Sequence, residues 1–152
     1  KEKFPYLGND VLITQDMCDL NEHMNVIYYA KIFEDEFPFY DSLGFTSDYF
    51  KQGYSFFTLE MNIRYLKEMR KGEIASPCFR YFAVKPKLIH YGGVLLNESG
   101  EVSSITENVL IHVDMNTRKS CEMSDSTIDH LKDMVAVHSA TGEIDFELRL
   151  KI

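Results

Sequence analysis

The chain has 152 residues, of which 45% are hydrophobic and 26% are charged. This length is typical of one domain with a buried core. The net charge of −8 argues against a general nucleic-acid binder, because contacts to phosphates need a basic surface. No apolar run approaches the ~20 residues that cross a bilayer, and the N-terminus lacks a signal-peptide core. We therefore expect one soluble, cytoplasmic domain over residues 1–152, with no membrane or nucleic-acid partner.

The three cysteines, Cys18, Cys78 and Cys121, are an odd number and include no C-x-x-C pair. Neither a disulfide framework nor a zinc knuckle fits this spacing. We expect reduced thiols and no metal or cofactor.

The first half of the chain contains the main helical pattern. A short β-rich run, "VLITQ" (11–15), predicts the first strand. Further on, apolar residues recur at three- and four-residue intervals and predict one helical face: Val26, Tyr29, Ala30, Phe33, Phe37 and Tyr40. Pro38 is expected to kink or restart this helix, and Gly44 to cap its end. "TSDYFKQG" (46–53) predicts a short helix that Gly53 ends.

The second half changes to a period of two, which predicts strands. A long strand begins at Tyr54, and the charged turn "KEMRKGE" (67–73) follows it. Three more strands are predicted at about 74–84, 87–97 and 102–114, the last two joined by the short connection "ESGE" (98–101). Pro77 indicates an edge or a bulge, and Gly92-Gly93 indicates a bulge or a close backbone approach. A helix over about 124–138 and a final strand over 143–152 complete the chain.

One long helix on one antiparallel sheet is an α+β arrangement. Such a sheet has under-covered edges and an under-covered outer face, so we expect an oligomer. No internal repeat or low-complexity stretch divides the chain.

A polar cluster precedes the long helix. "DLNEHMN" (19–25) places five polar side chains within seven residues, more than a turn requires. The longer stretch "DMCDLNEHMNVIYYAKIFE" (16–34) resembles the first motif of hotdog-fold acyl-CoA thioesterases of the 4-hydroxybenzoyl-CoA thioesterase type. Two residues differ from that motif: Glu22 stands where the family usually has glycine, and Val26 where many members have a second asparagine.

Three downstream segments strengthen the resemblance: "TLEMNIRYLKEMRKGE" (58–73), "KLIHYGGVL" (87–95) and "ENVLIHVDMNTRK" (107–119). Together they are similar to the branch that includes the carnitine-catabolism thioesterase, which cleaves betainyl-CoA. The similarity covers about residues 10–138, and the tail 139–152 has no counterpart. It implies a hotdog fold, in which an antiparallel sheet wraps a long central helix, with a C-terminal helix. It also implies a homodimer or homotetramer with the site between two subunits.

The chemistry of thioester hydrolysis assigns roles to the first motif. An activated nucleophile must attack the carbonyl carbon, and donors must stabilise the charge that develops on its oxygen. By the family's pattern, the Val26 N–H at the helix N-terminus polarises the carbonyl, and Asp19 is the nucleophile or general base. An ordinary N-cap or Asx turn is the alternative for Asp19. His23 holds the loop or the substrate, or is only structural, and Asn25 orients water or caps the helix.

Two further groups of residues are candidates for binding. Resemblance to the betainyl-CoA branch implies a cationic acyl group, which a carboxylate and aromatic rings suit. We expect Glu60 with Thr58 to line that site, with rings from Tyr28, Tyr54, Phe56 and Phe57; a solvated strand face and core packing are the alternatives. The predicted basic island for coenzyme A consists of Arg64, Lys67, Arg70, Lys71, Lys85 and Lys87, although an ordinary charged turn explains 67–71 equally well.

The leading hypothesis is therefore a hydrolase that cleaves a small acyl-CoA, with betainyl-CoA or a related short or polar acyl-CoA as candidate substrate. Coenzyme A is part of the substrate and not a cofactor. The alternative is a non-catalytic hotdog module that binds acyl-CoA or a small quaternary amine, which Glu22 and Val26 favour. A hotdog dehydratase is disfavoured, because its catalytic histidine is expected on a different local pattern. His90, His112, His130 and His138 are interpreted as structural or surface residues.

Overall fold

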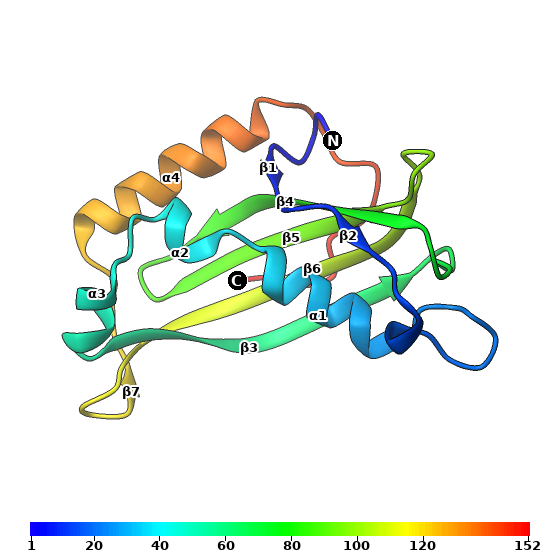
Figure 1. Cartoon of the computed structure of the whole chain (residues 1–152). Coiled ribbons are helices and arrows are strands. Elements are labelled where there is room, and N and C mark those ends of the chain that lie inside the picture. The colour runs from blue at the N-terminus through cyan, green and yellow to red at the C-terminus, as the bar shows by residue number, and fades with distance from the viewer.

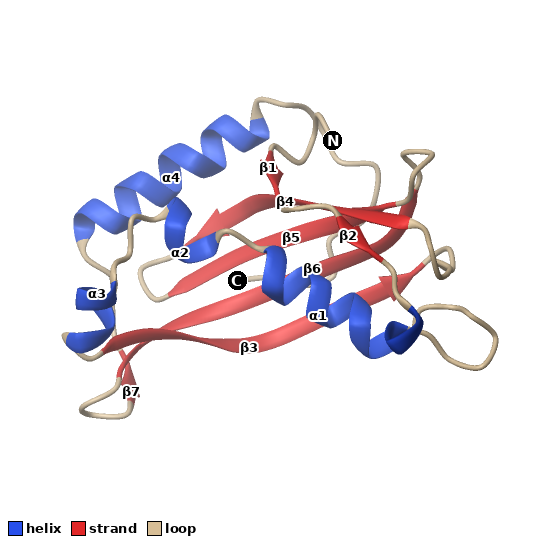
Figure 2. Ribbon diagram, in the orientation of Figure 1, coloured by secondary structure: helices blue, strands red, loops and turns tan.

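The computed structural model describes residues 1–152 as an antiparallel sheet with helices on one of its faces (Figures 1 and 2). The strands are β1 (Tyr6–Leu7), β2 (Val11–Leu12), β3 (Tyr54–Tyr65), β4 (Ile74–Val84), β5 (Leu88–Leu96), β6 (Val102–Asp114) and β7 (Lys119–Ser120). The helices are α1 (Val26–Glu36), α2 (Phe39–Ser42), α3 (Ser47–Lys51) and α4 (Asp125–Ser139). The order β1-β4-β5-β6-β3 leaves β3 at an open edge, while β2 pairs with β4 and β7 with β6. This is the α+β hotdog fold, as predicted.

The central helix α1 packs one face onto the sheet. Its buried residues Tyr29, Ile32 and Phe33 recur at helical spacing. The Phe33 ring lies 6.2 Å from that of Phe79 on β4, and the Tyr29 ring lies 5.2 Å from that of Tyr65 on β3. The helix thus crosses the face from β3 at the open edge to β4 on the other side of the sheet.

The helix ends where the sequence predicts a break. α1 stops at Glu36, and Pro38 separates it from α2, which confirms the predicted restart. Gly44 follows α2 with φ 65°, a left-handed conformation that glycine adopts without steric cost. Val26 departs from the prediction, because its side chain is 55% exposed in the first helical turn and is not part of the buried face.

Two glycines in β5 allow the sheet centre to pack closely. A Cβ atom at Gly92 would lie 2.7 Å from the Thr106 carbonyl oxygen, and one at Gly93 would lie 2.7 Å from the Phe79 ring. The ladder is regular at both positions. Close approach is therefore the correct one of the two predicted alternatives, and the bulges lie elsewhere, including one between Thr58 and Glu60 on β3.

The predicted strand at 143–152 does not form, and this prediction is wrong. Residues 140–152 contain no strand and cross the sheet face opposite α1. There the Glu107 carboxylate, which is fully buried, accepts the N–H groups of Arg149 (3.0 Å) and Leu150 (3.1 Å). The alternating apolar pattern arises because Phe146 and Leu150 cover this outer face. A side-chain carboxylate thus replaces the ladder bonds that a strand would make.

Histidine burial predicts how stability depends on pH. His138 of α4 is 4% exposed, and its Nδ1 accepts the N–H of Tyr81 at 2.9 Å. Burial lowers the pKa of His138, and the nearby charge of Arg80 lowers it further. Burial likewise lowers the pKa values of His90 and His112. All three are therefore neutral in the folded protein at pH values where the unfolded chain binds protons.

We expect the free energy of unfolding to be highest above the unfolded histidine pKa of about 6.5 and to fall as pH decreases below it. His138→Asn, whose side-chain oxygen can still accept the Tyr81 N–H, should reduce that slope by up to about 1.4 kcal/mol per pH unit. Urea unfolding of both proteins between pH 5 and 8 measures the slopes. Equal slopes would show that His138 does not contribute.

Candidate active site

The polar cluster forms a closed loop directly before α1. The Asn25 N–H donates to the Met17 carbonyl at 2.9 Å, and Cys18 pairs with Met24 as an isolated bridge. Within the loop, Oδ1 of Asp19 accepts the N–H groups of Asn21 (2.9 Å) and His23 (3.3 Å). The Asx turn predicted as the alternative role for Asp19 is therefore present. The side chain is exposed, and its second oxygen, Oδ2, has no hydrogen bond within the chain.

Glu22 adopts the backbone conformation that glycine favours. Its φ is 60°, in the left-handed region, which costs a residue with a Cβ about 1–2 kcal/mol. The Glu22 carbonyl accepts the N–H of Lys71 at 3.0 Å, so this conformation joins the loop to the 67–73 turn. Glu22 thus occupies a left-handed turn, a conformation that glycine adopts at no steric cost, and its side chain is exposed.

The N-terminus of α1 presents one free donor beside this loop. Asn25 is the N-cap, and its side chain accepts the Ile27 N–H at 3.2 Å, which confirms the predicted capping role. The Tyr28 N–H donates to the Asn25 carbonyl at 3.0 Å. The Val26 N–H has no hydrogen-bond partner within the chain. This N–H is therefore free to donate to a bound group, and it lies at the positive end of the helix dipole.

His23 fastens the loop to the turn that follows β3. Its Nδ1 lies 2.9 Å from Oε2 of Glu68, and its backbone forms a bridge with Arg70. The arrangement fits the predicted loop-holding role. It joins the candidate catalytic loop to basic residues of the 67–73 turn, which emerges from the same end of the sheet (Figure 1).

The predicted acyl-binding residues do not meet within one chain. Tyr28 lines a pocket beside Met17, and the Tyr54 ring stacks 5.4 Å from that of His112 at the other end of β3. Glu60 and Phe57 are exposed along the open edge strand. Of the predicted residues, only Phe56 and Thr58 share a pocket, which further aromatic rings also line.

The predicted basic island is also divided, and this prediction is corrected. Lys67, Arg70 and Lys71 lie in the turn before β4, whereas Lys85 and Lys87 lie in the turn after it, at the opposite end of that strand. The Arg64 guanidinium is mostly buried: its Nη2 lies 3.1 Å from Oε2 of Glu107 and donates to the Glu147 carbonyl at 3.0 Å. Arg64 therefore holds the tail and is not free to bind a phosphate.

Sequence reasoning missed an aromatic pocket at the C-terminal end of α1. The pocket has a volume of about 260 Å³ and lies between α1, α2 and the inner face of the sheet. Its lining residues are Glu34, Asp35, Phe37, Phe39, Tyr40, Phe56, Thr58, Tyr91 and Leu110. In the sequence pattern, Glu34 and Asp35 lie on the exposed face of the helix and give no sign of a pocket. The pocket forms because the chain breaks at Pro38, which places α2 over the sheet beside them.

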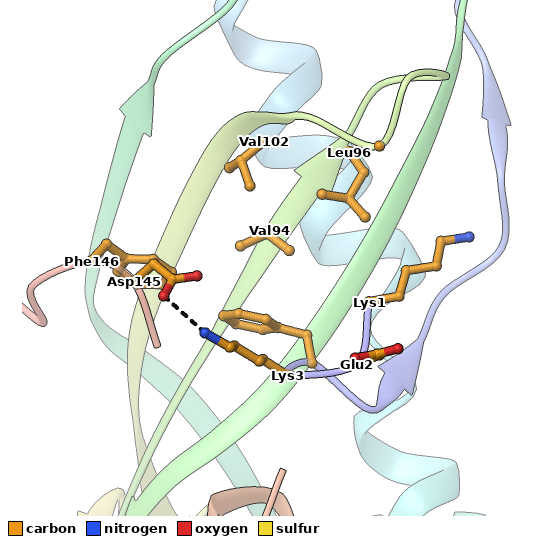
Figure 3. A pocket seen from close by; sticks show the side chains of 10 residues that line it. Lys1, Glu2, Lys3, Val94, Leu96, Val102, Asp145 and Phe146 are labelled. Carbon is orange, nitrogen blue, oxygen red and sulfur yellow. Dashed lines mark hydrogen bonds and ion pairs between the residues drawn. The ribbon is translucent and has the colours of Figure 1, made fainter. Parts of the chain in front are cut away.

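The largest cavity, of about 500 Å³, lies on the outer face of the sheet, between the N-terminal segment and the tail (Figure 3). The Lys3–Asp145 ion pair, at 2.8 Å, lies at its margin, and no predicted site residue lines it. No group of three or more His, Cys, Asp or Glu side chains is placed to hold a metal ion. No helix has both the length and the apolar character to span a bilayer.

Comparison with known proteins identifies the family. A family model described as the thioesterase-like superfamily matches residues 13–131. The chain belongs to this superfamily. The L-carnitine dehydrogenase/betainyl-CoA thioesterase of Agrobacterium fabrum is 26% identical to this superfamily member over 132 residues, which cover 84% of the chain and 27% of that protein. The chain thus matches about a quarter of the length of such relatives.

Solved structures confirm the thioesterase-like fold. A hypothetical protein of Staphylococcus aureus, SAV2348, determined in complex with CoA, superposes with a TM-score of 0.78 at 22% identity, over 96% of this chain and 94% of that one. The DHNA-CoA thioesterase of the same organism gives 0.77 at 20% identity, over 91% and 95%. At this identity the likeness establishes the hotdog fold alone.

Proposed function

We propose that the protein hydrolyses an acyl-CoA thioester, with Asp19 as nucleophile or general base and the Val26 N–H as the donor to the carbonyl oxygen. The observation that carries the proposal is the unpartnered N–H at the tip of α1, directly after a closed loop that presents a free carboxylate oxygen. Membership of the thioesterase-like superfamily and the names of the relatives support the same chemistry.

In this mechanism Oδ2 of Asp19 removes a proton from water or attacks the carbonyl carbon itself, while Oδ1 keeps the two loop hydrogen bonds. Negative charge develops on the carbonyl oxygen, where the Val26 N–H and the helix dipole stabilise it. Breakdown of the tetrahedral intermediate cleaves the carbon–sulfur bond and releases coenzyme A as a thiol. If Asp19 attacks directly, water then hydrolyses the acyl-enzyme anhydride to the free acid.

The substrate site is proposed to need a second copy of the chain. α1 has 11 residues and is therefore about 15 Å long, so its N-terminal donor and the aromatic pocket at its other end are too far apart for one small acyl group. β3 offers an open edge of 12 residues with exposed Phe57, Leu59 and Met61. A two-fold axis at this edge would make the two α1 helices antiparallel, so that the N-terminus of one faces the C-terminal half of the other.

Coenzyme A phosphates are proposed to meet Lys67, Arg70 and Lys71, because this turn contacts the Asp19 loop through His23 and Glu22. Lys67 and Arg70 already pair with exposed carboxylates, Glu101 and Glu68, which phosphate oxygens can replace. Betainyl-CoA, which the names of the relatives suggest, or a related short or polar acyl-CoA is the proposed substrate.

Thiol release from a panel of acyl-CoAs tests the activity. The panel should contain betainyl-CoA, acetyl-CoA, butyryl-CoA and an aromatic thioester. Turnover above the spontaneous rate supports the proposal. Binding of CoA without turnover of any panel member would favour a non-catalytic binding module.

Val26→Pro tests the backbone donor specifically. Proline is tolerated at the first position of a helix and removes only the N–H. The preceding Asn25 has ψ 145°, an angle compatible with a following proline. We expect kcat to fall by about 10²–10³-fold, the usual cost of one oxyanion donor. Asp125→Pro, at the first position of α4, is the matched control and should retain wild-type turnover. An active Val26→Pro protein would exclude the donor role.

A further inference from the structure

The aromatic pocket at the C-terminal end of α1 has the chemistry of a cation site. Its walls include the rings of Phe37, Phe39, Tyr40, Phe56 and Tyr91, and its rim carries two carboxylates. Aromatic faces attract cations through their negative π surface. A volume of about 260 Å³ is below the range of roughly 300–1,000 Å³ for drug-sized ligands, so the occupant is compact.

The two carboxylates at the rim differ in their partners. Asp35 forms an ion pair with Lys31 at 2.7 Å, one turn earlier on α1. Glu34 has no ion pair or side-chain hydrogen bond within the chain. Its carboxylate lines the pocket, and after burial it is the next cause that raises the pKa values of the Tyr40 and Tyr91 phenols. Glu34 is therefore the uncompensated negative charge of the pocket.

Tyr91 adds a free hydroxyl to the pocket lining. The residue is 4% exposed, its ring stacks 4.0 Å from that of Phe37, and it lines the pocket. Its hydroxyl has no hydrogen-bond partner within the chain, whereas the hydroxyls of the neighbouring Tyr29 and Tyr81 both have one. The Tyr91 oxygen is not fully buried, so a polar group of a bound molecule can reach it from the pocket.

We infer that this pocket binds the methylated ammonium head of the acyl group, with Glu34 as counter-charge and the Phe56, Tyr40 and Tyr91 rings as its walls. The inference rests on the proposed function and deepens it by assigning the residues that select a cationic acyl group. It replaces Glu60, Tyr28 and Tyr54 as the cation site, because those residues do not meet within one chain. The negative charge of Glu34 would repel an anionic acyl group, and a neutral acyl group would not balance that charge.

Binding of a free cation tests the pocket separately from catalysis. Choline and 3,3-dimethylbutan-1-ol have the same shape and differ in one charge. We expect choline to bind the full chain at least about tenfold more tightly, with shifts of the Tyr40 and Tyr91 ring signals in NMR titrations. Glu34→Gln should weaken choline binding by about three- to tenfold and leave the alcohol unchanged. Asp41→Asn, which removes an exposed charge of α2 outside the pocket, should leave both affinities unchanged.

Equal binding of choline and the alcohol, or equal effects of Glu34→Gln and Asp41→Asn, would overturn the cation site. So would ring shifts confined to Tyr28 and Tyr54. These outcomes are distinct from a failure of the proposed function. A protein that binds choline in this way but releases no thiol from any acyl-CoA would support the cation site and contradict the proposed hydrolase activity.

Discussion

Asp19→Asn is expected to lower kcat for acyl-CoA hydrolysis by about 10²–10⁴-fold, the range for loss of a positioned acid–base group. Asparagine retains a side-chain oxygen in the place of Oδ1, which can still accept the backbone N–H groups of Asn21 and His23. It removes the basicity and nucleophilicity of Oδ2. Steady-state thiol release on the best substrate of the panel measures the effect, and KM should change far less than kcat.

The control for this variant is Asp16→Asn, which removes an equal charge three residues earlier, where Asp16 bonds the Thr14 hydroxyl. It should keep wild-type turnover. The thermal midpoint of Asp19→Asn should stay close to that of the wild type, because exposed substitutions usually change stability by less than about 0.5 kcal/mol. Full activity in a folded Asp19→Asn protein would remove this residue from the mechanism.

Local patterns predicted much of the fold because each depends on residues close in sequence. Pro38 breaks the helix through its own ring and missing N–H, and Gly44 and Gly53 end α2 and α3 with positive φ. The period of two in 54–65 depends only on strand geometry. The capping role of Asn25 likewise involves a backbone N–H only two residues away.

Features that depend on long-range contacts were beyond sequence reasoning. The conformation of the tail depends on hydrogen bonds to Glu107, which lies more than 40 residues away in the chain. The ion pair between Glu107 and Arg64 also explains why Arg64 does not belong to the predicted basic island. The aromatic pocket joins Glu34 on α1 to Tyr91 on β5, and no local pattern links an exposed helix carboxylate to a buried strand tyrosine. The family resemblance covers Tyr91 but gives it no role.

Glu107→Ala is expected to destabilise the protein by about 3–5 kcal/mol, the usual effect of removing one partner from a buried ion pair. The carboxylate is fully buried and sits between Arg64, His90 and two backbone donors of the tail. Burial lowers the pKa of His90, so Arg64 is the positive charge that Glu107 balances. Without Glu107, the Arg64 charge and the N–H groups of Arg149 and Leu150 lose their partner together. Urea unfolding measures the loss.

A second measurement separates the tail from the ion pair. If the carboxylate holds the tail, trypsin should cleave Glu107→Ala after Arg149 at concentrations that leave the wild type intact. Glu101→Ala is the control, because its pair with Lys67 is exposed and should matter little. In Arg64→Met/Glu107→Leu the buried charges disappear as a pair, so unfolding stability should largely return while the tail remains sensitive to trypsin. Equal protection of the tail in all variants would mean that apolar contacts, such as the stacking of Phe146 on Phe4, hold it without Glu107.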